Sequence, residues 1–299
     1  MRKFGRKFIL TTKDKDGNDV IIQSPLTLQF AVKRFAYPAL ATATFTVLNI
    51  NEEKRGLLYR DSYQNQTSAM PAISVAAGYG EDMKTLPYIF IGNVKACTCY
   101  RREGAVDYIT EFECLGSSWA VQKATSQWST KAGETKDNTI LRLIDDMVKA
   151  DGSLSRGAIR LYGEDGYPRG ASFNGNSYDY LKRETEDKCF IDNGVIHVMD
   201  DKDEAYEGIL TKISSANGLL STPIKKDNFL HVDMLFEPSI SVGQKIALES
   251  TSYPYFNSDY KVMGVEHTGI ISDSVGGQCK TLLTLWGNNL LTLLQLNKK

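Results

Sequence analysis

A pattern that occurs twice in the chain constrains the fold more than any other feature. Each copy begins with a proline-led apolar run, continues with a strand interrupted by glycine, and ends with an alternating strand. The earlier copy comprises residues 71–75, 90–94 and 108–114, and the later copy comprises residues 238–242, 261–265 and 280–286. Corresponding positions lie 167 residues apart at the start (71 and 238) and 172 apart later (92 and 264; 114 and 286). This near-constant offset predicts two related β domains, with chance similarity between β-rich segments as the alternative.

The first part of the chain predicts a series of short strands. Ala43, Phe45 and Val47 alternate with threonines, which is typical of a half-buried strand. Similar patterns predict strands over residues 8–11, 20–22, 26–32, 43–48, 73–77, 88–99 and 107–115, and a short helix around 52–59. Short strands separated by turn signals indicate a barrel or a sandwich.

The middle of the chain changes character. Residues 139–150 place apolar side chains on one helical face, with Asp137 or Asn138 as the expected cap. A second helix is expected over residues 178–185, capped by Ser177. Asn193-Gly194 between two apolar runs predicts a hairpin. Residues 117–137 are expected to form an irregular crossing and residues 163–170 to be mostly turn, so two helices and a hairpin make up a small α+β insert.

After residue 203 the chain returns to a β pattern. Ala216-Asn217-Gly218 predicts a hairpin that joins residues 209–214 to 218–222, and residues 229–236 alternate. The predicted fold class is therefore mainly β with an α+β insert, that is, two related tube-like β-barrel domains flanking a small α+β region. The expected boundaries are 1–118 for the first barrel, 119–205 for the insert, 206–288 for the second barrel and 289–299 for a C-terminal segment.

Composition limits the classes of function. The 299 residues suffice for about two domains, and 42% of them are hydrophobic. A net charge of −1 at pH 7 gives no bulk attraction to nucleic acid or to an acidic membrane surface. No run approaches the roughly 20 apolar residues of a membrane span, and no signal peptide follows the basic start. We therefore expect a soluble protein that is synthesised in the cytoplasm.

The residue types that carry chemistry do not form known motifs. His197, His231 and His267 lie in three separate predicted strands, and no metal-ligand spacing joins them. The carboxylate pairs at 145–146, 200–201 and 111/113 are typical of solvated surfaces, and no Gly-x-Ser-x-Gly is present. The five cysteines form neither a disulfide framework nor a zinc pattern, although Cys97 and Cys99 share one strand face. The prediction is a protein that is not an enzyme, with no catalytic residue, cofactor or metal site.

Two apolar segments are candidates for contact with partners. Tyr253, Tyr255 and Phe256 form an aromatic loop cluster whose counterpart is 86–88, and exposed aromatic loops are good interface anchors. The alternative is that these rings fold back over a barrel end. Leu290, Leu293 and Leu294 belong to a leucine-rich C-terminal segment that is too apolar for a free tail, so we expect it to dock on a partner or on its own barrel.

The order of these patterns resembles the baseplate hub proteins of phage tails, including the late-control-protein branch of contractile tails. The residues that carry the resemblance include Phe45-Thr-Val-Leu-Asn-Ile50, Ile73-Ser-Val-Ala-Ala-Gly78, 88–94, 111–116, 139–150, 189–199, 208–210, 218–223, Ser239-Ile-Ser-Val-Gly-Gln-Lys245 and 260–265. They are patterns in order and contain no catalytic signature.

The resemblance implies a structural protein of the virion, located in the tail baseplate. Hubs of this family carry two tube-like barrels in each subunit, so three subunits present six barrels in a ring. Such a homotrimer would join the sixfold tail tube protein to a threefold central spike protein. It would also contact the tape measure protein and other baseplate proteins, while DNA passes through its lumen without specific binding. The alternatives are a tail-associated cell-wall hydrolase and a carbohydrate-binding β-protein that uses residues 253–256 for stacking.

Overall fold

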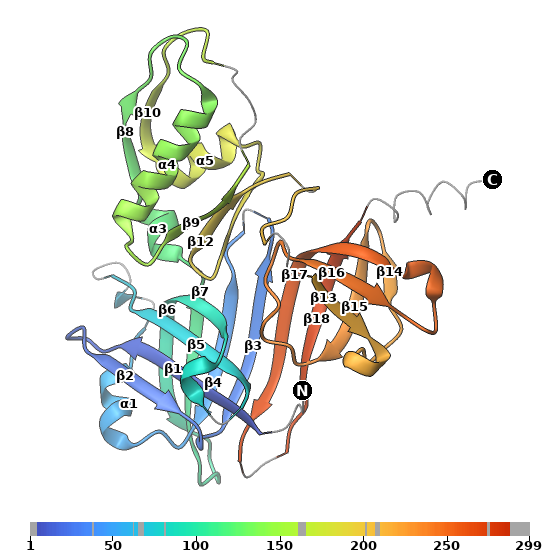
Figure 1. Cartoon of the computed structure of the whole chain (residues 1–299). Coiled ribbons are helices and arrows are strands. Elements are labelled where there is room, and N and C mark those ends of the chain that lie inside the picture. The colour runs from blue at the N-terminus through green and yellow to red at the C-terminus, as the bar shows by residue number, and fades with distance from the viewer. Residues whose placement is uncertain are drawn as a thin grey trace.

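A computed structural model describes the chain at residues 5–37, 39–61, 63–64, 69–80, 82–160, 166–200, 202–206, 210–273 and 276–287. The protein is mainly β, with a smaller α+β part that lies beside the sheets (Figure 1). This confirms the predicted fold class. No helix within the described ranges has the length and apolar character needed to cross a membrane.

The first β region contains seven strands whose side chains alternate between a buried and an exposed face. These strands are β1 (Arg6–Lys13), β2 (Asp19–Gln23), β3 (Leu28–Phe35), β4 (Thr42–Leu48), β5 (Ala72–Tyr79), β6 (Tyr88–Arg101) and β7 (Tyr108–Leu115). They lie in the order β3-β4-β7-β6-β5-β1-β2. The expected helix is present as α1 (Glu52–Leu58), capped by Asn51, and a single 3₁₀ turn, η1 (Met83–Thr85), precedes β6.

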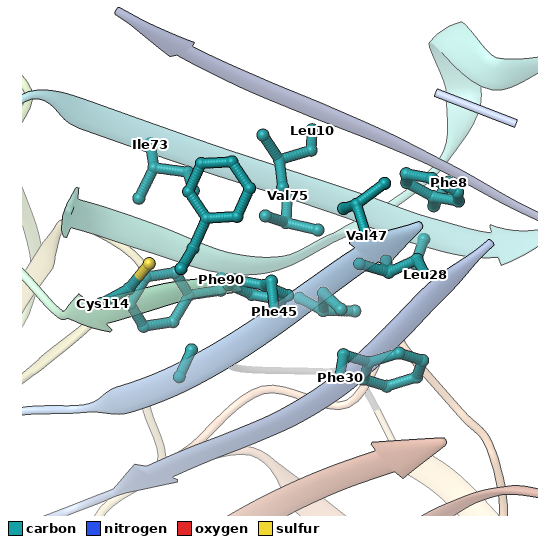
Figure 2. Packing of buried hydrophobic residues seen from close by; sticks show 14 of the residues in the cluster. Phe8, Leu10, Leu28, Phe30, Phe45, Val47, Ile73, Val75, Phe90 and Cys114 are labelled. Carbon is teal, nitrogen blue, oxygen red and sulfur yellow. The ribbon is translucent and has the colours of Figure 1, made fainter. Parts of the chain in front are cut away.

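Large apolar side chains fill the space that these strands enclose. Figure 2 shows Phe45 and Phe90 close together, with Phe8, Leu10 and Val75 from neighbouring strands around them. All five are fully buried. Burying side chains of this size stabilises the fold by about 1.5–3 kcal/mol each, which explains why strands with this alternation pack as one core.

The insert is more regular than the sequence indicated. It comprises α3 (Ser118–Lys123), β8 (Thr125–Ser129), α4 (Lys136–Ala150), β9 (Ser155–Ile159), β10 (Ser172–Asn176), α5 (Ser177–Glu184), β11 (Cys189–Asp192) and β12 (Val195–Val198). The expectation of an irregular crossing over 117–137 was wrong for α3 and β8, and strands β9 and β10 were not predicted. Strand β9 pairs in parallel with β12, and β8 pairs with β10, so long-range pairing orders segments whose local pattern is weak.

Helix caps in the insert also differ from the prediction by one to three residues. The side chain of Thr135 accepts a hydrogen bond from the N–H of Asn138 and so begins α4. The side chain of Asn176 caps α5 in the same way, by accepting a hydrogen bond from the N–H of Asp179. Asn is as favourable at this position as the predicted Ser177, whereas Thr ranks somewhat below Asp and Asn but is still one of the preferred capping residues. The predicted hairpin at Asn193-Gly194 is confirmed by the pairing of β11 with β12.

The second β region contains six strands. They are β13 (Leu210–Ser214), β14 (Ile224–Lys226), β15 (Phe229–Leu235), β16 (Lys245–Glu249), β17 (Ser258–Ile271) and β18 (Cys279–Trp286), with 3₁₀ turns η2 (Ser215–Asn217) and η3 (Pro254–Phe256). The predicted hairpin through Asn217-Gly218 was wrong, because β13 pairs in parallel with the distant β16. The predicted proline-led strand at 238–242 was also wrong, because these residues form turns and the strand begins at Lys245.

The two β regions nevertheless repeat one strand order. The second region has the order β14-β15-β18-β17-β16-β13, which matches β3-β4-β7-β6-β5-β1 strand for strand. Strands β6 and β17 each have 14 residues, and β7 and β18 each have eight. One difference is that β13 runs parallel to β16, whereas β1 runs antiparallel to β5. The repeat seen in the sequence therefore corresponds to a repeat of topology.

The register of the repeat differs from the sequence match. Both long strands carry a β-bulge, between Val94 and Ala96 in β6 and between Val262 and Gly264 in β17. The bulges make Gly264 the counterpart of Ala96, so the sequence match of Gly264 with Gly92 was wrong by four positions.

Candidate assembly interface

The aromatic loop predicted as a partner contact is half exposed. Tyr253 and Tyr255 are 41% and 57% exposed, whereas Phe256 is 6% exposed and packs in the core of the second β region. The ring of Tyr255 lies 4.3 Å from that of Phe256 and 5.3 Å from that of Tyr253, measured between centroids. The O–H of Tyr260 donates to the carbonyl of Phe256 at 2.8 Å and fixes the turn. Phe256 is therefore the anchor, and the two tyrosines are the side chains that a partner could reach.

The corresponding turn of the first β region has the same design. Leu86 follows η1 and is buried, and Tyr88 is 54% exposed at the start of β6. Each of the long strands, β6 and β17, thus begins next to a buried apolar side chain and an exposed tyrosine. An interface role for Tyr253, Tyr255 and Phe256 stays a prediction. Leu290, Leu293 and Leu294 lie outside the described residues.

A strand-to-strand joint connects the two β regions. The first part of β17, residues 258–261, pairs with β16, and its second part, residues 264–271, pairs antiparallel with β3 over eight residue pairs. One side of β17 therefore pairs first with a strand of its own β region and then with a strand of the other β region. Across the joint, the ammonium of Lys33 lies 3.1 Å from a carboxylate oxygen of Glu266. The strand order thus runs without a break from β14 to β2.

A buried charged pair lies where the two β regions and the insert meet. The guanidinium of Arg34 on β3 donates to both carboxylate oxygens of Asp192 on β11, at 2.8 and 3.0 Å. It also donates to the carbonyl of Ile240 at 3.0 Å, and Asp192 accepts from the N–H of Val242 at 3.1 Å. Arg34 and Asp192 are 1% and 2% exposed. Buried charges are tolerated only when paired in this way, so the pair fixes the relative position of three parts of the chain.

Arg34 and Asp192 were not among the residues predicted from the sequence to matter. A signal was present, because Leu28, Phe30 and Val32 occupy the buried face of β3 and Arg34 follows in the same alternation. An arginine at a core position requires a partner, but nothing in the sequence indicates that the partner is 158 residues away.

The insert makes further contacts with the first β region through its hairpin turn. The side-chain oxygen of Asn193 accepts from the N–H of Ile91 at 3.1 Å, and its amide donates to the carbonyl of Tyr88 at 3.2 Å. Asn193 has a φ of 47°, a left-handed conformation that asparagine tolerates well. The turn residues predicted for a hairpin thus also join two parts of the fold.

The three histidines lie in three separate strands, as predicted. His197 on β12 stacks on Phe190, and its Nδ1 accepts from the N–H of Ala158 at 3.1 Å. Burial lowers the pKa of His197 from 6.5 to about 4, with a smaller opposite effect of Asp192. His267 on β17 is fully buried, with Nδ1 2.9 Å from the hydroxyl of Thr281, and burial lowers its pKa well below 6.5. Both rings are neutral parts of the core at pH 7.

Three of the carboxylates considered for catalysis, Asp145, Asp146 and Asp200, are engaged in structural contacts. Asp146 accepts from Ser126 and from the indole N–H of Trp128, both at 2.7 Å, and Asp145 pairs with Arg156. Asp200 lies 2.8 Å from the ammonium of Lys188. Within the described ranges, no group of three or more His, Cys, Asp or Glu side chains is arranged to hold a metal ion.

The paired thiols of β6 share one face, as predicted. Cys97 is buried and Cys99 is half-buried. The hydrogen bond from the Cys97 thiol lowers the pKa of Cys99 to about 6, while the pKa of Cys97 is raised. Cys99 also lies 3.6 Å from the hydroxyl of Thr110.

Comparison with known structures identifies the fold. The 43 kDa tail protein of prophage MuSo2 from Shewanella oneidensis matches with a TM-score of 0.58 and 8% identity, over 96% of this chain and 98% of that one. A tail protein from Neisseria meningitidis matches with a TM-score of 0.56 and 9% identity, over 95% and 97%. The E. coli c3393 protein, a type VI secretion component described as similar to the T4 tail proteins gp27 and gp5, matches with a TM-score of 0.57 and 9% identity, over 93% and 77%.

Sequence comparison adds the family. No curated protein sequence matches the chain. The family model described as baseplate hub gp41 matches residues 7–269, which include nearly all of the first β region, the insert, and the second β region as far as β17. The match extends over the insert, the buried pair of Arg34 and Asp192, and most of the β3–β17 joint. The chain is therefore a member of the baseplate hub gp41 family.

Proposed function

We propose that three copies of this chain form a ring at the centre of a phage tail baseplate. The ring adapts a sixfold tail tube to a threefold central spike, and it surrounds a lumen for the tape measure protein and then for DNA. Membership of the baseplate hub family supports the location in the virion, after synthesis in the cytoplasm of the host. The proposed contacts are with the tube protein, the spike protein and other baseplate proteins.

The repeated strand order is the observation that carries the proposal. Each chain has two β regions of the same order, joined edge to edge through β17 and β3. Three chains therefore supply six similar units, and closed rings are the usual result when such units meet through one kind of contact. A near-neutral chain, with a net charge of −1 at pH 7, suits a passage that must release DNA rather than hold its phosphates.

The mass of the particle in solution tests the proposal. Light scattering of the purified chain over rising concentration should give a mass three times that of the 33.3 kDa chain. Electron microscopy of the same sample should show a ring with threefold symmetry and six similar lobes. A chain that remains a monomer at every concentration, and that binds no tube or spike protein, would contradict the proposal.

A further inference from the structure

Strand β6 is the counterpart of β17. On the side where β17 pairs first with β16 and then with β3, β6 pairs with a strand only in its first part. Residues 88–93 of β6 pair with β5, as 258–261 of β17 pair with β16. The second part of β17 then pairs with β3, whereas no strand of the described chain pairs with the outer side of β6 beyond Cys97. Cys97 itself forms an isolated bridge with Arg60. The repeat therefore leaves one strand position beside β6 without an occupant in the described part of the protomer.

The strand that corresponds to β3 is β14, which ends the strand order of the second β region. The correspondence follows from shared neighbours. Ala43 of β4 faces Cys114, the second-last residue of β7, and Leu230 of β15 faces Leu285, the second-last residue of β18. On the next strand, Val32 faces Ala43 and Lys225 faces Leu230. Strand β14 thus repeats residues 31–33 of β3.

The β-bulges define which residues of β6 correspond to which residues of β17. Because Ala96 corresponds to Gly264, Thr98 corresponds to Glu266 and Tyr100 corresponds to Thr268. In the internal joint, Glu266 faces Lys33 and Thr268 faces Ala31. The same joint made with β14 would place Lys226 opposite Thr98 and Ile224 opposite Tyr100.

We infer that β14 of one protomer pairs antiparallel with residues 98–100 of β6 in a second copy of this chain, in that register. The inference rests on the ring proposed above, and it assigns the contact that closes the ring. Each protomer would then use the joint twice, once within the chain through β3 and β17 and once between chains through β14 and β6.

The side chains at the two edges fit this register. Ile224 is 63% exposed and Tyr100 is 37% exposed, so pairing would cover two apolar surfaces. Aromatic and β-branched side chains form favourable pairs across antiparallel strands. Lys226 would lie beside Thr98, whose neighbour on β7 is Glu111. The opposite charges of Lys226 and Glu111 would repeat, one strand further on, the pair that Lys33 and Glu266 form in the internal joint.

The length of β14 also fits the space. Strand β14 ends at Lys226, and Asp227 turns away with a φ of 54°. In the internal joint, Arg34 faces Val265. Asp227 is the counterpart of Arg34 and Cys97 is the counterpart of Val265, so the proposed register would place Asp227 opposite Cys97. Arg60 already occupies the position opposite Cys97. A longer strand would collide with Arg60, whereas three residues fill only the positions opposite 98–100.

Disulfide trapping in the full-length chain tests the register. Thr98→Cys combined with Lys226→Cys should give covalent dimers and trimers after mild oxidation of the assembled protein, because residues that face each other across strands are within disulfide distance. Lys33→Cys combined with Glu266→Cys is the matched control, because it occupies the same two positions of the internal joint. It should form a disulfide within one chain, and each single variant should form no additional cross-link.

The outcomes separate this inference from the proposed function. A trimer by mass whose Thr98–Lys226 variant stays uncross-linked, while the internal control pair oxidises, would overturn the register and leave the ring intact. Absence of any trimer for the unmodified chain would overturn both. Intermolecular cross-links that appear only in the paired variant support the inference.

Charge reversal gives a second test that does not depend on thiols. Lys226→Glu should weaken the contact between protomers by about two- to fivefold, because it brings a like charge towards Glu111 on the next strand. Adding Glu111→Lys should restore much of the loss. An unchanged association constant for Lys226→Glu, or no recovery in the double variant, would count against the proposed register.

Discussion

At the scale of single residues, buried polar groups explain more of this structure than exposed ones. His197 lies in the core between Phe190 and Tyr206, and its Nδ1 accepts a hydrogen bond from Ala158. The proton therefore resides on Nε2, which has no hydrogen-bond partner among the described residues. A second proton at Nδ1 would face an N–H donor, so charging this ring opposes folding.

This histidine predicts a loss of stability in mild acid. Its pKa is 6.5 when unfolded and about 4 when folded, so the unfolded state binds more protons between these values. The free energy of unfolding should therefore fall as pH drops from 6.5 to 4, by on the order of 1 kcal/mol per pH unit for this group.

Urea denaturation at a series of pH values measures this slope. His197→Gln removes the titrating ring while it keeps an amide oxygen as acceptor, so the slope over this range should become smaller. His267, whose pKa is also lowered by burial, should preserve part of it. An identical pH profile for the variant and the unmodified protein would refute the assignment to His197.

At the scale of elements, the long bulged strands set the geometry of both β regions. Each changes partner near its bulge, and each passes close to the strand that follows it. Gly92 lies on β6 just before the bulge, where a Cβ would meet the carbonyl oxygen of Leu115 at 2.4 Å and the Cα of Gly116 at 2.9 Å. Both neighbours are backbone atoms, so they cannot move independently.

Gly92→Ala is therefore expected to lower the free energy of unfolding by about 1–3 kcal/mol, the usual cost of overpacking. Gly56→Ala in α1 is the matched control, because nothing lies within 4 Å of its added methyl group. There the better helix propensity of alanine should raise stability by roughly 0.5–1 kcal/mol. Thermal and urea denaturation of both variants measure the two effects, and equal behaviour would contradict the close approach.

At the scale of the whole molecule, one buried pair holds three parts of the chain together. Arg34 belongs to the first β region, Asp192 to the insert, and Ile240 and Val242 to the second β region. The β3–β17 joint lies beside this pair, since Arg34 is itself part of β3 and faces Val265. The relative position of the two β regions, on which a ring depends, is thus fixed by backbone pairing and by charge.

Arg34→Met should destabilise the protein by about 3–5 kcal/mol, because it leaves the carboxylate of Asp192 buried without its cation. Adding Asp192→Leu should recover a large part of this loss, since an apolar pair avoids the cost of an unpaired charge. Urea denaturation of the single and double variants gives both values. A double variant that is no more stable than Arg34→Met would show that the pair acts through its shape rather than through its charge.

The type of many elements, and the fact that a pattern of strands recurs, can be predicted from local sequence patterns alone. Alternation at period two marks Ala43, Phe45 and Val47 as a strand, and the spacing of Ile140, Leu143, Ile144 and Met147 marks a helix, because burial of one face is a local property of each segment. The family resemblance, which rests on the same ordered patterns, was also available from the sequence and is confirmed by the family match.

Which strands pair with one another depends on the packing of the whole chain and cannot be predicted from local patterns. Backbone donors and acceptors are alike in every strand, so nothing local indicates that β13 pairs with β16, that β3 pairs with β17, or that Arg34 meets Asp192. These contacts depend on packing between segments that are far apart in the chain. The bulges at Val94 and Val262, which fix the register of the repeat, are likewise visible only once the partners are in place.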